Sequence, residues 1–277
     1  MPPKFCQPAA ARARNYTLAM TVLLALDSST ETMALALSSP AGRLYFEAAG
    51  GPQASVRLVP EALALLARAG LSLADVDAIA FGCGPGAFTG LRAACAVAQG
   101  LAFGAGLPVL SIDSLLLVAE DARQQAAAAG QPLVGLIWVA MDARIGEIYA
   151  AAYRFETAGF EAAAWVCVEA PALYKPEALR AHWQSPAAVA GSALTVHAEA
   201  LRGGDSESQT QAQAQRRWPH SASRASALAE LAAQAWASGA LLDAALAMPV
   251  YVRDKVAQTT AERLAARAAL PHDRVIV

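Results

Sequence analysis

Between residues 81 and 92 the chain reads Phe81-Gly82-Cys83-Gly84-Pro85-Gly86-Ala87-Phe88-Thr89-Gly90-Leu91-Arg92. An apolar run at 76–81 precedes this stretch and a run of small residues at 93–104 follows it, which predicts a tight turn between a strand and a helix. Glycine adopts positive φ angles without a steric penalty and lets other groups approach closely, and proline fixes φ. Because N–H groups at the start of a helix attract anions, this glycine turn is a candidate phosphate-binding loop.

Other interpretations of the glycine turn stay open when only the residues are considered. A Walker phosphate loop needs a lysine after its last glycine, whereas Gly90 is followed by Leu91 and Arg92. A dinucleotide-binding fingerprint fits weakly, because no acidic residue ends a second strand about 20 residues later. A structural turn that binds no ligand accounts for the same glycines and proline about equally well.

Composition narrows the class of protein. The 277 residues are 56% hydrophobic, which is enough for one large domain or two modest ones. A net charge of −2 argues against an extended nucleic-acid-binding surface on this chain alone. No apolar run reaches the roughly 18 residues of a membrane span. The four cysteines contain no Cys-x-x-Cys motif, so we expect a reduced, cytoplasmic protein without a membrane segment.

Strands and helices alternate along the chain and predict an α/β fold of two related lobes. The predicted strands are 22–26, 33–37, 76–81, 108–111, 136–141, 148–153 and 189–193, and the predicted helices are 55–69, 91–104, 114–129 and 221–238. Leu24-Ala25-Leu26-Asp27 matches Val139-Ala140-Met141-Asp142, since each is a strand that ends in aspartate before a polar turn and another strand. The predicted lobes are 20–113 and 114–277. Residues 1–19 are expected to be a disordered tail or a start-site artefact, and residues 202–220 a flexible insertion.

Few residues form a pattern that predicts catalysis. Asp27 and Asp142 follow strands, so they are candidates to bind a metal ion or phosphate between the lobes, or else to cap their own hairpin turns. The histidines lack metal-ligand spacing. Cys83 fits a small buried side chain better than a nucleophile, because no histidine is evident as its base. We predict no catalytic residue and no metal ligand.

Several blocks of the chain resemble the TsaB (YeaZ) family. They are Leu24-Ala25-Leu26-Asp27-Ser28-Ser29-Thr30-Glu31, residues 82–92, Ala98-Gln99-Gly100-Leu101-Ala102, Asp142-Ala143-Arg144-Ile145-Gly146-Glu147-Ile148-Tyr149 and Pro249-Val250-Tyr251-Val252-Arg253. The resemblance runs from residue 20 to about residue 253 and implies an actin-like ASKHA fold with two βαβ lobes. It also implies a part in making N6-threonylcarbamoyladenosine at position 37 of tRNAs that read codons beginning with A.

The resemblance further implies a subunit that does not itself catalyse the transfer. In the family a paralogue, TsaD, makes the transfer, and its metal ligands include a His-x-x-x-His pair. Ser114 and Val118 stand at the matching positions here, and neither is a useful metal ligand. We expect a non-catalytic scaffold or activating subunit that pairs with TsaD through helices 55–69 and 91–104 and works with the ATPase TsaE. It would form a homodimer when alone and contact tRNA only indirectly, with no cofactor of its own and with ATP or ADP and Mg²⁺ acting at the level of the complex.

The predicted site residues form two groups. The predicted nucleotide contacts are Asp27, Ser28, Gly84, Gly86 and Asp142, and the predicted partner contacts are Leu58, Leu65, Ala94 and Val97. Many family members carry histidine before the first long helix, where this chain has Ala54-Ser55. One alternative is an ASKHA-fold small-molecule kinase or ATPase with Asp27 and Asp142 around Mg²⁺ and phosphate. Another is a metal-dependent peptidase, against which the missing histidine pair argues.

Overall fold

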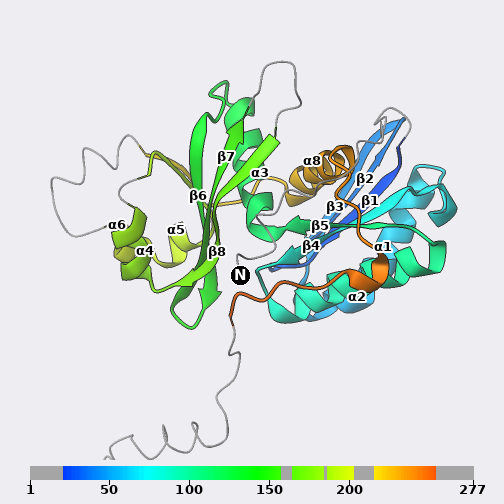
Figure 1. Cartoon of the computed structure of the whole chain (residues 1–277), viewed down its shortest axis with the longest axis horizontal. Coiled ribbons are helices and arrows are strands. Elements are labelled where there is room, and N and C mark those ends of the chain that lie inside the picture. Colours follow the sequence, from blue (N-terminus) through cyan, green and yellow to red (C-terminus); the bar gives the residue numbers. More distant parts are fainter. Residues whose placement is uncertain (1–20, 157–163, 184–185, 203–214, 254–277) are drawn as a thin grey trace, which may run out of the picture.

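Each half of the chain forms a five-stranded mixed sheet (Figure 1). The computed structural model describes residues 21–156, 164–183, 186–202 and 215–253. The first sheet has the order β3-β2-β1-β4-β5, with β1 (Leu23–Asp27), β2 (Thr32–Ser39), β3 (Gly42–Ala49), β4 (Ala78–Gly84) and β5 (Val109–Asp113). The second has the order β10-β9-β6-β7-β8, with β6 (Gly135–Arg144), β7 (Glu147–Glu156), β8 (Ala164–Tyr174), β9 (Ala188–Ala190) and β10 (Arg216–Trp218).

The two sheets repeat one pattern of strand pairing. In the first sheet, β1 pairs antiparallel with β2 and parallel with β4, β2 pairs antiparallel with β3, and β4 pairs parallel with β5. In the second sheet, β6 takes the place of β1, and β7, β8, β9 and β10 repeat the remaining pairings in the same order. This repeat confirms the prediction of two related lobes and an ASKHA-like α/β fold.

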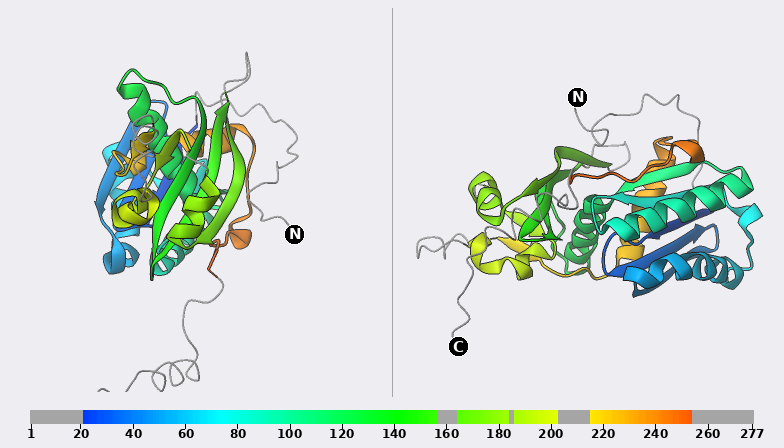
Figure 2. Two further views of the ribbon diagram at one scale, coloured as in Figure 1. Left: turned by 90° about the vertical axis from the view of Figure 1, so that its left-hand side faces the viewer. Right: turned by 90° about the horizontal axis from the view of Figure 1, so that it is seen from below.

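Helices cover both faces of each sheet. On the first sheet, α1 (Ala54–Arg68) and α2 (Phe88–Ala105) cover one face and α8 (Arg224–Ala237) covers the other. On the second sheet, α3 (Ser114–Ala128) covers one face, while α4 (Pro176–Trp183) and α5 (Ala193–Val196) cover the other, with α6 (Ala198–Arg202) packed on α4. Figure 2 shows the lobes side by side along the long axis. Among the described helices, none has the length and apolarity needed to cross a bilayer.

The helices α3 and α8 each pack on the sheet of the other half of the chain. α3 follows β5 of the first sheet but packs on Ile137 and Val139 of the second. α8 follows β10 of the second sheet but packs its Leu228 against Leu23 and Ala25 of the first. Because α3 and α8 also contact each other, crossed helices join the two lobes. The predicted boundary that gave residues 114–277 to the second lobe is therefore wrong for α8, which completes the first lobe.

The strand β1 is buried on both faces, as its unbroken apolar sequence requires. Leu24 and Leu26 face the core beneath α1 and α2, while Leu23 and Ala25 face α8. β1 is thus the central strand around which the first lobe packs.

Three strands were not predicted, namely β3, β8 and β10. β10 lies inside the segment 202–220, which was predicted to be a flexible insertion, and it pairs in parallel with β9. That prediction is wrong for residues 216–218, while residues 203–214 and the predicted tail at 1–19 lie outside the described residues. β10 consists of two arginines and a tryptophan, so it has no apolar alternation by which a strand could be recognised.

Three of the four predicted partner contacts are core residues of the first lobe. Leu58 and Ala94 have no exposed surface, and Leu65 is 1% exposed. Val97 is half-buried against the same core. The helical spacing used for the prediction marks the apolar face of a helix, and that face packs on the chain's own sheet. The prediction that Leu58, Leu65 and Ala94 contact a partner is therefore wrong.

The substitution Leu58→Ala distinguishes a core position from a surface position. Because it removes a fully buried side chain, we expect the free energy of unfolding to fall by ~2–5 kcal/mol. Leu63→Ala, one and a half turns along the same helix at a side chain that is 46% exposed, is the matched control and should cost less than ~1 kcal/mol. Urea denaturation of the two variants measures the difference, and equal losses would contradict the assignment.

Candidate functional site

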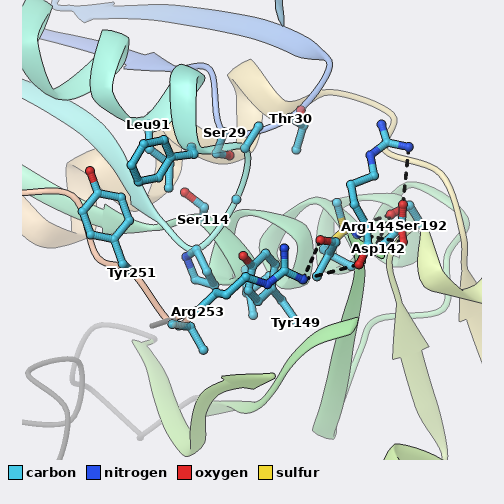
Figure 3. A pocket seen from close by; sticks show the side chains of 18 of the residues that line it. Ser29, Thr30, Leu91, Ser114, Asp142, Arg144, Tyr149, Ser192, Tyr251 and Arg253 are labelled. Atoms are coloured by element: carbon cyan, nitrogen blue, oxygen red, sulfur yellow. Dashed lines mark hydrogen bonds and ion pairs between the residues drawn. The ribbon is translucent and has the colours of Figure 1, made fainter. Parts of the chain in front are cut away.

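A cavity of about 270 Å³ lies between the two lobes. Figure 3 shows Ser29, Thr30, Leu91 and Ser114 on one side of this cavity and Asp142, Arg144 and Tyr149 on the other, while Tyr251 and Arg253 come from the end of the described chain. We call this cavity the cleft. Two predicted nucleotide contacts, Gly86 and Asp142, line it, and nucleotide binding by these residues stays a prediction.

The aspartate at the end of β1 forms a buried ion pair. The Arg224 guanidinium donates to Oδ2 of Asp27 from Nε at 3.1 Å and from Nη2 at 2.9 Å. Nη2 also donates to the Ser29 hydroxyl at 3.0 Å, and that hydroxyl donates to Oδ2 of Asp27 at 3.1 Å. Asp27 is 0% exposed and does not line the cleft. Its carboxylate is therefore neutralised by the chain's own α8, which contradicts the prediction that it contacts a nucleotide.

The glycine turn packs against the chain itself rather than around an empty site. A Cβ atom on Gly82 would lie 1.9 Å from Oδ1 of Asp27, and one on Gly90 would lie 1.8 Å from the Ser28 carbonyl oxygen. The Ser28 hydroxyl donates to the Gly90 carbonyl at 2.8 Å. Ser28 is 1% exposed, so it is not a nucleotide contact either. The glycines are needed here because other residues would collide with the turn between β1 and β2.

Two N–H groups of the turn already have acceptors. Gly84 donates to the Ser114 hydroxyl at 3.0 Å, and Ala87 donates to the Ser29 carbonyl at 2.7 Å. Gly84 is buried, and its φ of +118° requires glycine. Because the N–H groups of Gly84 and Ala87 are already bonded, they do not point at an anion as the donors of a phosphate-binding loop must. The prediction that Gly84 contacts a nucleotide is wrong, and of the open interpretations the structural turn is the one this geometry supports.

Asp142 faces the cleft, but its carboxylate has partners too. Nε2 of His197 lies 3.1 Å from Oδ1, which also accepts from the Arg144 backbone at 3.1 Å. Arg144 in turn forms an ion pair with Glu31, across the cleft in the first lobe. The kinase or ATPase alternative requires both Asp27 and Asp142 at Mg²⁺ and phosphate, and only Asp142 is in the cleft.

Ser114 and Val118, at which no metal ligand was predicted, both lie in the first part of α3. Ser114 lines the cleft and accepts from Gly84, whereas Val118 is 7% exposed and packs on the second sheet. Within the described residues, no three or more His, Cys, Asp or Glu side chains cluster as metal ligands. Cys83 is 3% exposed and burial raises the pKa of its thiol, so it is a buried side chain rather than a thiolate nucleophile.

Residues 248–253 form an extended strap that sequence reasoning did not place. At the first lobe, Val250 donates from its backbone N–H to the Cys83 carbonyl at 2.7 Å. At the second lobe, Arg253 donates to the Ala143 carbonyl at 3.0 Å and to the Glu147 carboxylate at 2.6 Å. The motif Pro249-Val250-Tyr251-Val252-Arg253 was recognised as extended, but nothing in the sequence indicates that it bridges the lobes.

A partly buried carboxylate joins the two lobes. Asp113, the last residue of β5, accepts from the Tyr153 hydroxyl of the second lobe at 2.5 Å and from the backbone of Leu115 at 2.8 Å. Burial raises the pKa of Asp113 to about 6, against the opposing effect of the Tyr153 bond. Protonation of Asp113 therefore changes a hydrogen bond that joins the two lobes.

Several known proteins are similar to this chain. A family model described as "TsaD: tRNA N6-adenosine threonylcarbamoyltransferase" matches residues 51–261. The chain is 34% identical over 175 residues to the tRNA threonylcarbamoyladenosine biosynthesis protein TsaB of Escherichia coli K12, covering 63% of this chain and 70% of that protein. It is 41% identical over 127 residues to TsaB of Haemophilus influenzae, covering 46% and 51%. The solved structure of YeaZ from Pseudomonas aeruginosa is similar, with a TM-score of 0.68 and 33% identity over 84% of this chain and 100% of that one.

The raised pKa of Asp113 predicts a pH dependence of stability. Between its ordinary value of 3.8 and about 6, the folded protein keeps a proton that the unfolded chain has released. Raising the pH through this window therefore favours unfolding. We expect the stability of the wild type, relative to Asp113→Asn, to fall by ~1–3 kcal/mol between pH 4 and pH 7 and to level off above about pH 6. Denaturant unfolding at each pH measures the difference. A difference that stays flat or rises with pH would contradict the assignment.

Removal of the Arg253 side chain should loosen the strap. Hydrogen bonds to charged groups contribute ~1.5–3 kcal/mol. We therefore expect Arg253→Gln to speed hydrogen exchange about tenfold or more at residues 143–147 and 250–253. Exchange in the core of α1 should not change. The control is Arg154→Gln, because Arg154 forms a surface pair with Glu156. Equal exchange in both variants would show that the strap is held elsewhere.

Proposed function

The chain belongs to the TsaD family and its named relatives are TsaB (YeaZ) proteins, and on this premise we propose that it acts in the synthesis of tRNA N6-threonylcarbamoyladenosine as a subunit that does not itself perform the transfer. A TsaD-type partner would carry the catalytic site, and the modified base would be adenosine 37 of tRNAs that read codons beginning with A. The tRNA would be reached through that partner.

The observation that carries the non-catalytic part of the proposal is the ion pair between Asp27 and Arg224. A carboxylate that already binds a guanidinium, at a position without exposed surface, is not free to bind a metal ion or activate a reactant. Ser114 and Val118 in place of the two histidines support the same conclusion. We place ATP or ADP and Mg²⁺, together with the ATPase TsaE, at the level of the complex rather than on this chain.

The exposed face of α1 and α2 is our proposed contact with the TsaD-type partner. Val56, Leu63 and Phe103 are 68%, 46% and 80% exposed, which is unusual for apolar side chains of this size on neighbouring helices. On α2, Gly100 and Gly104 have open space where a Cβ atom would stand. Small residues let a second helix approach closely, so this face suits a helix bundle between subunits. The same face would form a homodimer when the partner is absent.

The direct test is depletion of the protein followed by nucleoside analysis of tRNA. We expect N6-threonylcarbamoyladenosine to fall to background and to return when the wild-type chain is supplied. Gly100→Arg should fail to restore it and should bind a TsaD-type subunit at least about tenfold more weakly, because a long side chain would keep the helices apart.

The matched control is Ala128→Arg, which adds the same side chain to the exposed end of α3. It should restore the nucleoside and bind as the wild type does. A depleted strain with unchanged N6-threonylcarbamoyladenosine would refute the proposed function. Normal binding by Gly100→Arg would refute the proposed contact face alone.

A further inference from the structure

Arg92 is the single charged residue of the 18-residue helix α2. It is exposed and begins a row of exposed residues that continues with Ala96, Gly100 and Phe103, spaced by three or four positions along one side of the helix. This row is the part of α2 that lies within the proposed partner face. Arg92 therefore stands at the end of an apolar surface that carries few other charges.

The guanidinium of Arg92 is held in place by two aromatic rings. Its central carbon lies 3.8 Å from the centroid of the Phe88 ring, and its Nε donates to the Tyr251 hydroxyl at 3.0 Å. The Phe88 and Tyr251 rings also pack against each other, with centroids 5.0 Å apart. Stacking on an aromatic face and a bond at Nε restrict a side chain that is usually mobile. The orientation of Arg92 is thus set before any ligand arrives.

The donors on the outer side of this guanidinium are unused within the described part of the chain. No carboxylate of the described residues forms an ion pair with Arg92, whereas Arg57 on the neighbouring helix pairs with Glu61 at 2.9 Å. No hydrogen bond runs from either terminal nitrogen of Arg92 to a described residue. The two terminal amino groups of a guanidinium form a planar fork that matches the two oxygens of a carboxylate.

We infer that Arg92 binds a carboxylate of the TsaD-type partner and fixes the register in which the two pairs of helices pack. The inference rests on the proposed function. A fork that is already oriented loses less side-chain entropy on binding, and arginine is enriched among residues that dominate interface energies. Apolar contacts alone do not fix how two helix pairs are aligned. One ion pair at the edge of the apolar face therefore selects a single arrangement of the helices.

A tRNA phosphate is the other anion that such a fork recognises. The surroundings favour a carboxylate on a protein, because the face beside Arg92 consists of apolar and small side chains rather than further cations. α1 and α2 together carry three arginines and one glutamate, and one of those arginines is already paired with the glutamate. Binding to a phosphate backbone requires several cations along a track.

The test is the affinity of the full chain for a TsaD-type subunit, measured by titration calorimetry at several salt concentrations. We expect Arg92→Gln to weaken binding about tenfold and to flatten its salt dependence, with a melting temperature within about 4 °C of the wild type. Arg92→Lys should restore only part of the affinity, because an ammonium group cannot form the fork. Tyr251→Phe, which removes the acceptor of Nε, should give a smaller loss of affinity. The control, Arg154→Gln on the second lobe, should bind as the wild type does.

Each other outcome refutes a definite part of the inference. If the affinity of Arg92→Gln for the partner is within twofold of the wild-type affinity, Arg92 does not bind a carboxylate of the partner. If that variant instead weakens only the binding of tRNA to the assembled complex, the anion is a phosphate and the inference is wrong. If the wild-type chain does not bind a TsaD-type subunit at all, the proposed function fails and this inference fails with it.

Discussion

The first lobe depends on one buried ion pair, between Asp27 at the end of β1 and Arg224 at the start of α8. β1 is the central strand of its sheet, and α8 arrives from the far end of the chain to cover the open face of that sheet. The pair therefore fixes where the last helix returns to the first strand. Taking two charges out of water is costly, and removal of either partner would leave an uncompensated charge in the core, at a cost of ~3–5 kcal/mol. Gly82 makes room for the carboxylate, because a Cβ atom there would collide with it.

Hydrogen bonds around this ion pair also position the glycine turn and the helix α2 that follows it. Ser29 bonds both to the ion pair and to Ala87, and Ser28 bonds to Gly90, so the β1–β2 turn positions the start of α2. In a phosphate-binding loop, such groups would point at the anion. Here they bind each other. The result is a helix with a rigid start and an exposed apolar face, which suits a subunit that acts by presenting a surface to a partner.

Much of the architecture follows from the sequence because its causes are local. Unbroken apolar runs mark β1 and β4, helical spacing marks α1 and α3, and the repeated strand-and-aspartate pattern marks the two lobes. The exchange of α3 and α8 between lobes could not be predicted, since it depends on contacts between residues about 100 positions apart. Arg224 likewise has no sequence feature that links it to Asp27.

The candidate site was harder to predict than the fold, for a physical reason. Helical spacing locates the buried face of α1 and α2 but says nothing about which exposed residues a partner would cover, so Leu58, Leu65 and Ala94 were assigned to the wrong face. Asp27 and the glycines of the turn suggested a ligand, whereas their contacts are with other parts of the chain. Only the three-dimensional contacts separate a ligand-binding residue from one that binds another part of the protein.

The most direct test of this account is the rate of tRNA threonylcarbamoylation by a complex reconstituted with the double variant Asp27→Asn/Arg224→Gln. The substitutions remove both charges but keep groups that can bond to each other. If Asp27 serves only the structure, a double variant that folds should support the reaction at close to the wild-type rate. A double variant that melts at the wild-type temperature, binds its partner normally and yet abolishes the reaction would show that Asp27 takes part in the chemistry.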